Sequence, residues 1–419
     1  MHILFLTPAF PPFPGGGERY ALSLAKELTR RGHIITTLTS HARTEQDFWQ
    51  AGSQPTVITR NGETNLQIIR CPVKPTSGGR PALLAWRKMM VLLSALPGDQ
   101  SRPLMHLARR IPAIPALEPT LNDLQTPFDL VQVFNLSWEY PLTAGWRYAQ
   151  RRNLPLAVIP YTHLGVGSRD RVAWNSTMDH QRKILSAADA VLTLTTIEEE
   201  GWVKLGLQPE RVKTIHGGLD RPFPPPDTAP ILKRLKLSKP YVLFLGRATF
   251  DKGVVHAVQA VIRLNNANTP VILVLAGQST PEFKRIYRKL SAQEKTWIRP
   301  LGIINDEEKQ ALLSETEMLL LPSKTDSFGI VILEAWGYGR PVIGARAGGI
   351  PGVIDDGRNG LLVEFGDVPG LAAAIQQLVE NPAQKEAMGQ AGLEKVNSVY
   401  QWEKVGDRVE EMYRRIVQL

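Results

Sequence analysis

The chain has 419 residues, of which 43% are hydrophobic and 21% are charged, and its formal net charge is +9. This composition excludes a disordered protein, and the length favours two domains over one. The single cysteine, Cys71, excludes an internal disulfide, so we expect a cytoplasmic protein. The positive charge suits anionic partners, but no basic-aromatic stripe is present, and we expect no nucleic acid partner.

Short apolar runs alternate with longer amphipathic segments along the chain. The first run follows the initial Met and is too short for a signal peptide or a membrane span, so it is a predicted buried strand. The first predicted helix covers Tyr20–Arg31. The predicted strands are Ile3–Leu6, Ile34–Thr39, Leu130–Phe134, Ala157–Tyr161, Ala190–Thr195, Tyr241–Leu245, Val271–Ala276, Met318–Pro322 and Pro341–Gly344. This alternation predicts an α/β protein with doubly wound parallel sheets.

A proline-rich stretch, Arg221–Pro230, separates two such series and predicts a stiff linker between two domains. We therefore expect one domain over residues 1–220 and a second over residues 221–399. The last helix, residues 400–419, is expected to rejoin the first domain. Ligands of open α/β sheets bind beyond the carboxyl ends of the strands, so a cleft between the domains is the expected site.

The first candidate anion site is the run of glycines at Gly15, Gly16 and Gly17, between a predicted strand and a predicted helix. Glycines let backbone N–H groups near a helix start approach an anion closely. The run matches neither the dinucleotide fingerprint nor the phosphate-binding loop with its lysine. A plain turn explains it equally well.

A basic segment, residues 80–117, has no such motif but an unusual charge balance. It contains six basic residues and one acidic residue, Asp99, interleaved with Leu, Met and Trp; the basic residues are Arg80, Arg87, Lys88, Arg102, Arg109 and Arg110. A basic amphipathic segment is typical of a contact with an anionic membrane, but it also fits a helical insertion with a solvated basic face.

A second candidate anion site follows the strand Tyr241–Leu245. Gly246 and Arg247 end this strand, and Lys252 comes five residues after the arginine. A guanidinium and an ammonium at one strand end are suited to a diphosphate. The alternative is a pair of solvated surface cations.

The stretch KTDSFGIVILEAWGYGRPVIG, residues 324–344, contains two acids whose placement needs an explanation. Asp326 lies in a predicted loop, and we expect a helix to begin near Phe328. Glu334 lies on that helix among apolar residues, without an obvious partner, and a buried charge requires one. We expect sugar hydroxyls to bind Asp326 and the two hydroxyls of a ribose to bind Glu334. The alternative makes Asp326 or Ser327 a helix cap and Glu334 a solvent-facing residue.

Together these motifs resemble the retaining glycosyltransferase family 4. The likeness is carried by Gly-Arg…Lys-Gly, by the acid–Phe-Gly–glutamate pattern and by RPVIGARAGGIPGVIDDGRNGLLVEFGD in the second half. In the first half it is carried by PGGGERYALSLAKELTRRGHIITTLT and by ADAVLTLT with HGGLD. The resemblance implies the GT-B architecture, with two facing Rossmann-like domains: an acceptor-side domain first and a nucleotide-sugar donor domain second.

The resemblance also implies a role for individual residues. It places the donor diphosphate on Arg247 and Lys252, the ribose on Glu334 and the transferred sugar beside Asp326 and His163. The implied catalytic residues are His163, Arg247, Lys252 and Asp326. The implied donor-binding residues are Gly16, Gly17, Gly246, Arg247, Lys252, Ile303, Asp326, Ser327, Phe328, Gly329, Ile330, Val331 and Glu334.

The sequence departs from the family pattern at three positions. Asp326 stands where the family usually has glutamate, which leaves the identity of the sugar open. Gly217 replaces a common asparagine and Gly352 a common glutamate. Neither of these two changes removes a group to which we assign an essential chemical role.

The implied activity is metal-independent transfer of a hexose from a UDP-sugar or GDP-mannose to a hydroxyl acceptor, with no cofactor. A lipid-linked or cell-envelope glycan precursor is one candidate acceptor, with peripheral contact at the inner face of the cell membrane through residues 80–117. The same architecture also serves epimerases and phosphorylases, although no clear pyridoxal phosphate lysine is present. The alternative of a different class is a non-catalytic scaffold that binds a nucleotide sugar.

Overall fold

The computed structural model describes residues 1–418 except 51–54, 56, 64, 165–170, 221–226, 238 and 239. It divides into two compact units: unit 1 is Met1–Gly217 with Trp402–Leu419, and unit 2 is Gly218–Gln401. The predicted boundaries after residues 220 and 399 stand close to these. Residues 221–226 of the predicted linker lie outside the described residues.

The described residues of unit 1 form an eight-stranded sheet in the order β3-β4-β2-β1-β5-β6-β7-β8. Its strands are β1 (His2–Leu6), β2 (Ile34–Ser40), β3 (Thr59–Glu63), β4 (Leu66–Cys71), β5 (Leu130–Phe134), β6 (Leu156–Ile159), β7 (Ala190–Thr193) and β8 (Val212–Thr214). All pairings are parallel except that of β3 with β4. The sheet is parallel, as predicted, except at this edge, because the connection from β3 to β4 is too short for a crossover.

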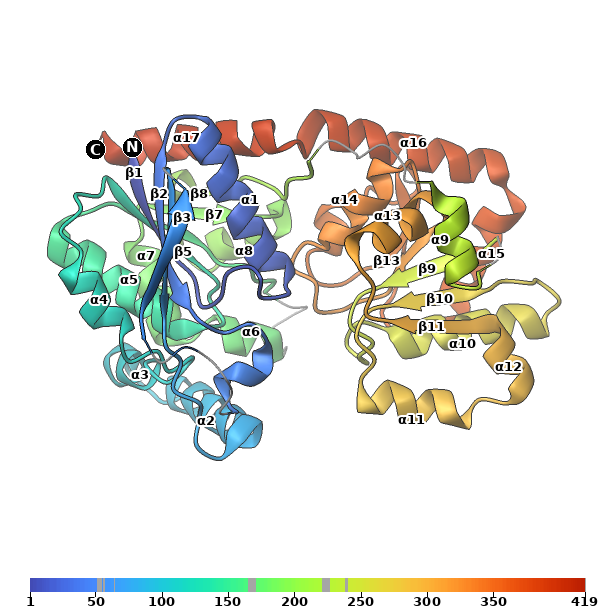
Figure 1. Ribbon diagram of the computed structural model, residues 1–419, viewed down its shortest axis with the longest axis horizontal. Helices are drawn as coiled ribbons and strands as arrows, with labels where there is room; N and C mark the ends of the chain where they lie inside the picture. The colour runs from blue at the N-terminus through green and yellow to red at the C-terminus, as the bar shows by residue number, and fades with distance from the viewer. Residues whose placement is uncertain are drawn as a thin grey trace. The chain divides into compact units, whose positions relative to one another are not determined.

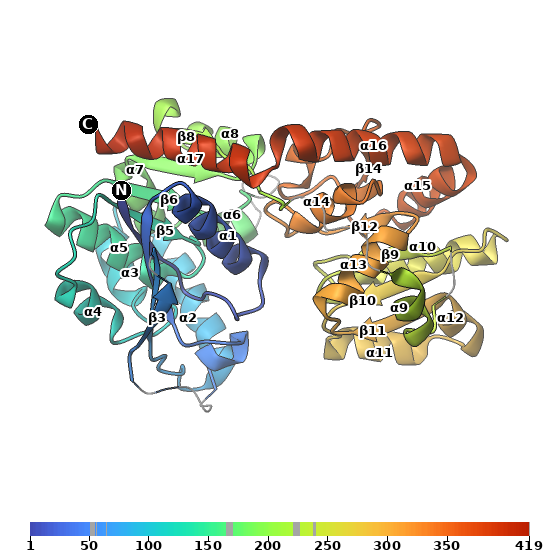
Figure 2. The ribbon, with the colours of Figure 1, turned by 45° about the horizontal axis from the view of Figure 1, so that its top comes forward.

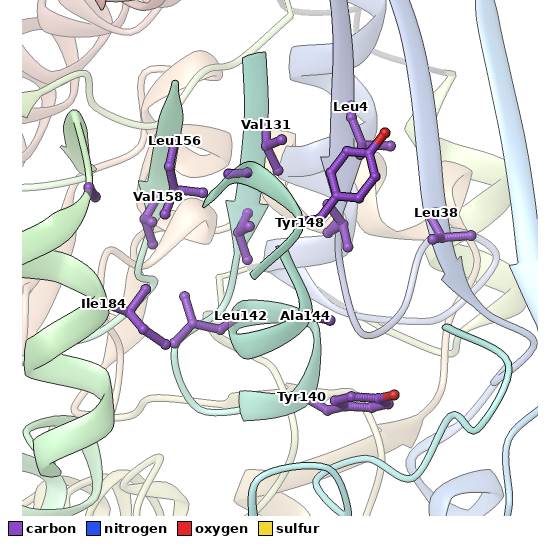
Figure 3. Close-up of a cluster of buried hydrophobic side chains, with 14 of the residues drawn as sticks. Leu4, Leu38, Val131, Tyr140, Leu142, Ala144, Tyr148, Leu156, Val158 and Ile184 are labelled. Atoms are coloured by element: carbon purple, nitrogen blue, oxygen red, sulfur yellow. The ribbon is translucent and has the colours of Figure 1, made fainter. Parts of the chain in front are cut away.

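Helices follow most strands of unit 1 and bury their apolar sides against the sheet. They are α1 (Gly16–Arg30), α2 (Gly79–Ser94), α3 (Ser101–Leu107), α4 (Leu117–Asp123), α5 (Glu139–Arg152), α6 (Arg171–Ser176), α7 (Asp179–Ala187), α8 (Thr196–Lys204) and α17 (Trp402–Val417). Figure 3 shows the core where side chains of β1, β2, β5 and β6 meet α5 and α7, with Leu4, Val131, Tyr148 and Ile184 among them. The basic segment 80–117 thus forms mainly α2 and α3.

The last helix, α17, lies along α1 and completes unit 1 (Figure 1). Arg31 joins the two helices: its guanidinium lies 2.6 Å from Glu27, 3.1 Å from Glu410 and 2.9 Å from Asp407. Deeper in the unit, the Tyr413 hydroxyl donates to the side chain of Gln132 on β5 at 2.8 Å, and both residues are fully buried. A buried amide needs such a partner, so α17 supplies a hydrogen bond to the sheet as well as apolar area.

The described residues of unit 2 form a six-stranded parallel sheet in the order β11-β10-β9-β12-β13-β14. The strands are β9 (Val242–Leu245), β10 (Leu273–Ala276), β11 (Ile298–Gly302), β12 (Leu319–Leu321), β13 (Val342–Ala345) and β14 (Gly360–Val363). The helices are α9 (Thr228–Arg234), α10 (Val254–Asn266), α11 (Pro281–Lys289), α12 (Ala292–Trp297), α13 (Asp306–Glu315), α14 (Ile330–Gly337), α15 (Val368–Glu380) and α16 (Pro382–Val399). Figure 2 shows α16 beside α14.

The sequence pattern predicted the strands better than the helix starts. Each predicted strand exists, with ends displaced by a few residues at most. The first helix begins at Gly16 rather than at Tyr20, and the helix expected near Phe328 begins at Ile330. Among the described residues, no helix combines the length and apolar character needed to cross a membrane.

Candidate active site

Two loops interlock at the carboxyl ends of β9 and β12 in unit 2. Gly253, in the loop after β9, has a φ of 77°, and a Cβ there would lie 1.9 Å from the carbonyl oxygen of Pro322. Only glycine allows both the left-handed backbone and this close approach. The backbone N–H of Lys324 donates to the carbonyl of Asp251 at 3.0 Å, which joins the loops further. The two predicted motifs therefore belong to one surface.

An ion pair between Lys252 and Asp326 lies where these loops meet. The Lys252 Nζ is 2.7 Å from Asp326 Oδ1, and both side chains are half-buried. The other carboxylate oxygen, Oδ2, is buried and has no hydrogen-bond partner among the described residues. An unsatisfied carboxylate oxygen is costly, so this atom is suited to a donor from a ligand.

A glycine pair after β13 fixes the backbone of Asp326. The Gly349 N–H donates to the Asp326 carbonyl at 2.8 Å. A Cβ at Gly348 would lie 2.5 Å from that carbonyl oxygen, and a Cβ at Gly349 would lie 1.8 Å from the carbonyl oxygen of Ser327. The loop 326–329 therefore packs directly on a glycine backbone, with no space for a side chain between them.

The helix α14 begins directly after this loop. Gly329 is its N-cap, with a φ of 81°, and supplies no side-chain hydrogen bond. The interpretation of Asp326 or Ser327 as the cap is therefore wrong. The first N–H groups of the helix, at Ile330 and Val331, have no acceptor within the helix, and the positive end of the helix dipole favours an anion there. The side chain of Phe328 belongs to the core, because its ring is buried against Tyr400.

The prediction that Glu334 lacks a protein partner is wrong. Lys309 on α13 lies 2.8 Å from its carboxylate, and both side chains are half-buried. Sequence analysis missed Lys309, because only the packing of α13 on α14 brings the two residues together. Tyr338 lies one turn further along; burial raises the pKa of its hydroxyl, and the charge of Glu334 adds to this shift. The ribose role of Glu334 stays a prediction.

Three further predicted residues of unit 2 follow β9 and β11, the two strands that flank β10 in the sheet. Gly246 ends β9 with a φ of 150°, and its N–H donates to Ala276 on β10 at 2.8 Å. Arg247 follows it and is exposed. Ile303, between β11 and α13, is 80% exposed, so its side chain is free of the core.

Gly16, Gly17 and His163 belong to unit 1. Gly16 is the first residue of α1, and the Gly17 carbonyl accepts a hydrogen bond of 3.0 Å from the hydroxyl of Tyr161. His163 follows Tyr161 by two residues and is buried. The start of α1 and the end of β6 are thus adjacent. Burial raises the pKa of Glu18, in the first turn of α1, to about 7, a shift that sequence analysis did not predict.

Among the described residues, no group of three or more His, Cys, Asp or Glu side chains is placed to hold a metal ion. Metal independence stays a prediction.

Family comparisons cover most of the chain. Residues 231–395 match the model for glycosyl transferases group 1, and residues 15–218 match that for the glycosyl transferase 4-like domain. The alpha-maltose-1-phosphate synthase of Mycolicibacterium smegmatis is 30% identical over 259 residues, which are 56% of this chain and 65% of that protein. A D-inositol 3-phosphate glycosyltransferase of Thermobifida fusca is 27% identical, over 65% of this chain and 66% of that protein. The matches thus span just under two thirds of these relatives.

Solved structures resemble the chain over its whole length. Sucrose-phosphate synthase from Thermosynechococcus elongatus superposes with a TM-score of 0.73 and 22% identity, covering 100% of this chain and 99% of that one. Anabaena HepE in complex with UDP has a TM-score of 0.69 and 18% identity, covering 99% and 100%. These likenesses show a shared fold, the GT-B fold, and confirm that prediction.

Proposed function

Residues 231–395 belong to the glycosyl transferases group 1 family and residues 15–218 to the glycosyl transferase 4-like domain family, and on this basis we propose a function. The chain transfers a hexose from a nucleoside diphosphate sugar to a hydroxyl acceptor and retains the anomeric configuration. It needs neither a metal ion nor a cofactor. Unit 2 binds the donor, and unit 1 binds the acceptor.

The observation that carries this proposal is the environment of Asp326. One of its carboxylate oxygens is paired with Lys252 at 2.7 Å, and the other is buried without a partner among the described residues. A sugar hydroxyl is a neutral donor that satisfies this second oxygen. Beside it, Lys252 and the start of α14 provide positive charge for a phosphate. Sugar and phosphate recognition thus adjoin each other.

The proposed chemistry breaks the bond between the anomeric carbon and the β-phosphate oxygen. Negative charge grows on the departing diphosphate, and Arg247, Lys252 and the N–H groups of Ile330 and Val331 stabilise it. We assign no covalent nucleophile. The acceptor oxygen attacks from the face that the phosphate leaves, and the phosphate takes its proton. His163 lies beside the donor sugar.

For the donor, we propose a UDP-sugar or GDP-mannose. Glu334 accepts hydrogen bonds from the ribose while Lys309 keeps its contact with the carboxylate, and the backbone near Ile303 contacts the base. Complexes of Anabaena HepE with UDP and with UDP-glucose support the UDP choice, since that protein shares the fold.

Thermal unfolding with UDP, GDP and ADP tests the donor site. A nucleotide at about one hundred times its Kd adds roughly 2.7 kcal/mol to the free energy of unfolding. We expect one nucleotide to raise Tm in the wild type and to lose most of this effect in Arg247→Ala. Arg263→Ala, which removes a cation from the last turn of α10, is the matched control. No response to any of the three nucleotides would count against the donor site.

A second candidate function is a non-catalytic scaffold. Asp326 favours it, because the carboxylate is one methylene shorter than the glutamate that the resemblance leads us to expect. A scaffold binds nucleotide but releases no nucleoside diphosphate from any donor. Product release from UDP-glucose, UDP-galactose or GDP-mannose in the presence of acceptors therefore separates the two functions.

For the acceptor, we propose a lipid-linked glycan precursor reached by peripheral contact of residues 80–117 with the inner face of the cell membrane. The exposed face of α2 supports this contact. Leu84 is 55% exposed, Leu92 60% and Leu96 54%. The exposed residues of α2 are Arg80, Pro81, Leu84, Ala85, Lys88, Met89 and Leu92, and the exposed Ala95 and Leu96 follow the helix directly. The opposite face is also apolar and packs in a core cluster, so the helix is apolar on both sides. Exposed leucines beside lysine favour an anionic lipid surface.

Vesicle flotation tests this contact. We expect binding to vesicles of phosphatidylcholine with phosphatidylglycerol, weaker binding to phosphatidylcholine alone, and loss of binding in Leu84→Gln/Leu92→Gln. Leu205→Gln, at an exposed leucine after α8, is the control. Equal binding by all three proteins would exclude the α2 face, and concentration-dependent dimerisation lost in the double variant would assign that face to a second copy.

A further inference from the structure

A buried carboxylate in unit 1 remains outside the proposed chemistry. Glu198 lies in the first turn of α8 and is 2% exposed. Burial raises the pKa of its carboxyl, while the backbone hydrogen bonds from Leu194 and Thr162 lower it and favour the ionised form. Burying a carboxyl group destabilises the fold unless hydrogen-bond donors or an opposite charge compensate for the lost water.

Both carboxylate oxygens of Glu198 bind backbone N–H groups at strand ends. One oxygen accepts from Thr162 at 3.1 Å, beyond β6, and the other accepts from Leu194 at 3.0 Å, beyond β7. The strands β6 and β7 are parallel neighbours in the sheet. A single side chain thus joins the carboxyl ends of two adjacent strands, which is the edge where ligands of such sheets bind.

Thr162, whose N–H donates to Glu198, directly precedes His163. The Thr162 hydroxyl lies 3.2 Å from the carbonyl oxygen of His163 and 2.8 Å from the hydroxyl of Ser176. The backbone before His163 is therefore fixed by the carboxylate, and the backbone after it by the Thr162 hydroxyl. The four residues that this carboxylate and this hydroxyl contact are all buried: Thr162, Leu194, His163 and Ser176.

We propose that Glu198 is the positioning residue for His163: it holds the backbone of Thr162 so that the imidazole keeps its place. This inference rests on the proposed function, in which His163 lies beside the donor sugar. Glu198 itself touches no substrate. Its task is geometric, and small displacements of a group beside a reacting centre cost up to about 100-fold in rate.

The variant Glu198→Gln has nearly the same shape but replaces one acceptor oxygen with an NH₂ group. That group meets an N–H donor of Thr162 or Leu194, so one of the two hydrogen bonds is lost. The neighbouring Glu199 offers a matched control. Its carboxylate accepts from the N–H of Thr214, the last residue of β8, at 2.7 Å through one oxygen, so Glu199→Gln makes the same chemical change one residue away and off the path to His163.

The experiment measures kcat and the donor KM for the full chain in Glu198→Gln, His163→Ala and the double variant. We expect Glu198→Gln to lower kcat by about 10- to 100-fold with little change in KM. We expect the double variant to be no slower than His163→Ala, because Glu198 acts only through the imidazole that His163→Ala removes. Glu199→Gln keeps the wild-type kcat. Multiplied losses in the double variant would overturn the proposal.

A second measurement is independent of activity. In protein labelled with ¹³C at histidine, the ring resonance of His163, assigned through His163→Ala, shifts in Glu198→Gln and stays in place in Glu199→Gln. An unmoved resonance overturns the positioning role even in an active enzyme. If the wild type releases no nucleoside diphosphate while the resonance shifts, the proposed function fails and the geometric inference stands. Should Glu198→Gln not fold, Thr162→Val tests the same backbone through the hydroxyl.

Discussion

At the scale of single residues, glycines determine where the functional groups of unit 2 lie. Gly253 allows the Lys252 loop to touch Pro322, and Gly349 allows the Asp326 loop to touch the backbone after β13. The ion pair between Lys252 and Asp326 therefore depends on glycine at these two positions, because a side chain at either would collide with the backbone of the facing loop.

We predict that Gly349→Ala abolishes most of the nucleotide-induced rise in Tm and destabilises the protein by about 1–3 kcal/mol. The new Cβ would lie 1.8 Å from the carbonyl oxygen of Ser327, so the loop that carries Asp326 must move. Gly339→Ala is the control: its φ is 65°, but a Cβ there meets nothing within 4 Å. A Gly349→Ala protein that binds nucleotide as the wild type does would contradict the prediction.

The sequence was informative about these residues only in part. Lys252 and Asp326 were predicted to serve one ligand, and the fold places them in contact. The partner of Glu334 was not foreseen, because Lys309 lies 25 residues away on another helix and no local pattern links the two. The position of Glu198 at the two strand ends was not foreseen either, because a glutamate in the first turn of a helix is usually explained by its favourable interaction with the helix dipole.

At the scale of secondary structure elements, the contact of α17 with α1 depends on a network of charges. Burial alone would raise the pKa of Glu410, but hydrogen bonds from Arg414 and Arg31 lower it from 4.5 to about 2. A carboxyl group whose pKa is lower in the folded state than in the unfolded state stabilises the fold, and it does so fully at pH values above its unfolded pKa. This stabilisation is lost as the pH falls from 4.5 through 2.

We therefore predict that Glu410→Gln lowers the free energy of unfolding by roughly 1–2 kcal/mol at pH 6 and by less at pH 3. Urea unfolding at the two pH values, followed by circular dichroism, measures the difference. Glu411→Gln, at an exposed neighbour on the same helix, is expected to change little at either pH. An equal loss at both pH values would show that the charge of Glu410 is irrelevant.

The elements themselves were largely predictable, because apolar runs of four to seven residues mark buried parallel strands. The pattern missed β3, β4, β8, β11 and β14. The polar strand β3 has no apolar run, and α14 starts late because Gly329 adopts a left-handed backbone.

At the scale of the whole molecule, unit 2 is one continuous stretch, while unit 1 is assembled from two. We predict that residues 218–401 fold when produced alone, because they contain a complete sheet and its own core. Residues 1–217 alone are expected to melt at lower temperature than in the full chain, since Gln132 then lacks the Tyr413 hydroxyl. Circular dichroism melts check both. An unfolded 218–401 fragment would contradict this division.

The position of α17 also has a consequence for biosynthesis. A ribosome makes the chain from its N-terminus, so β5 with its Gln132 emerges long before Tyr413, and the whole of unit 2 is translated in between. Unit 2 can therefore acquire its structure while the earlier-made part is still incomplete. The first unit to be synthesised is the last to be finished, and until then the surface of α1 that α17 covers stays exposed.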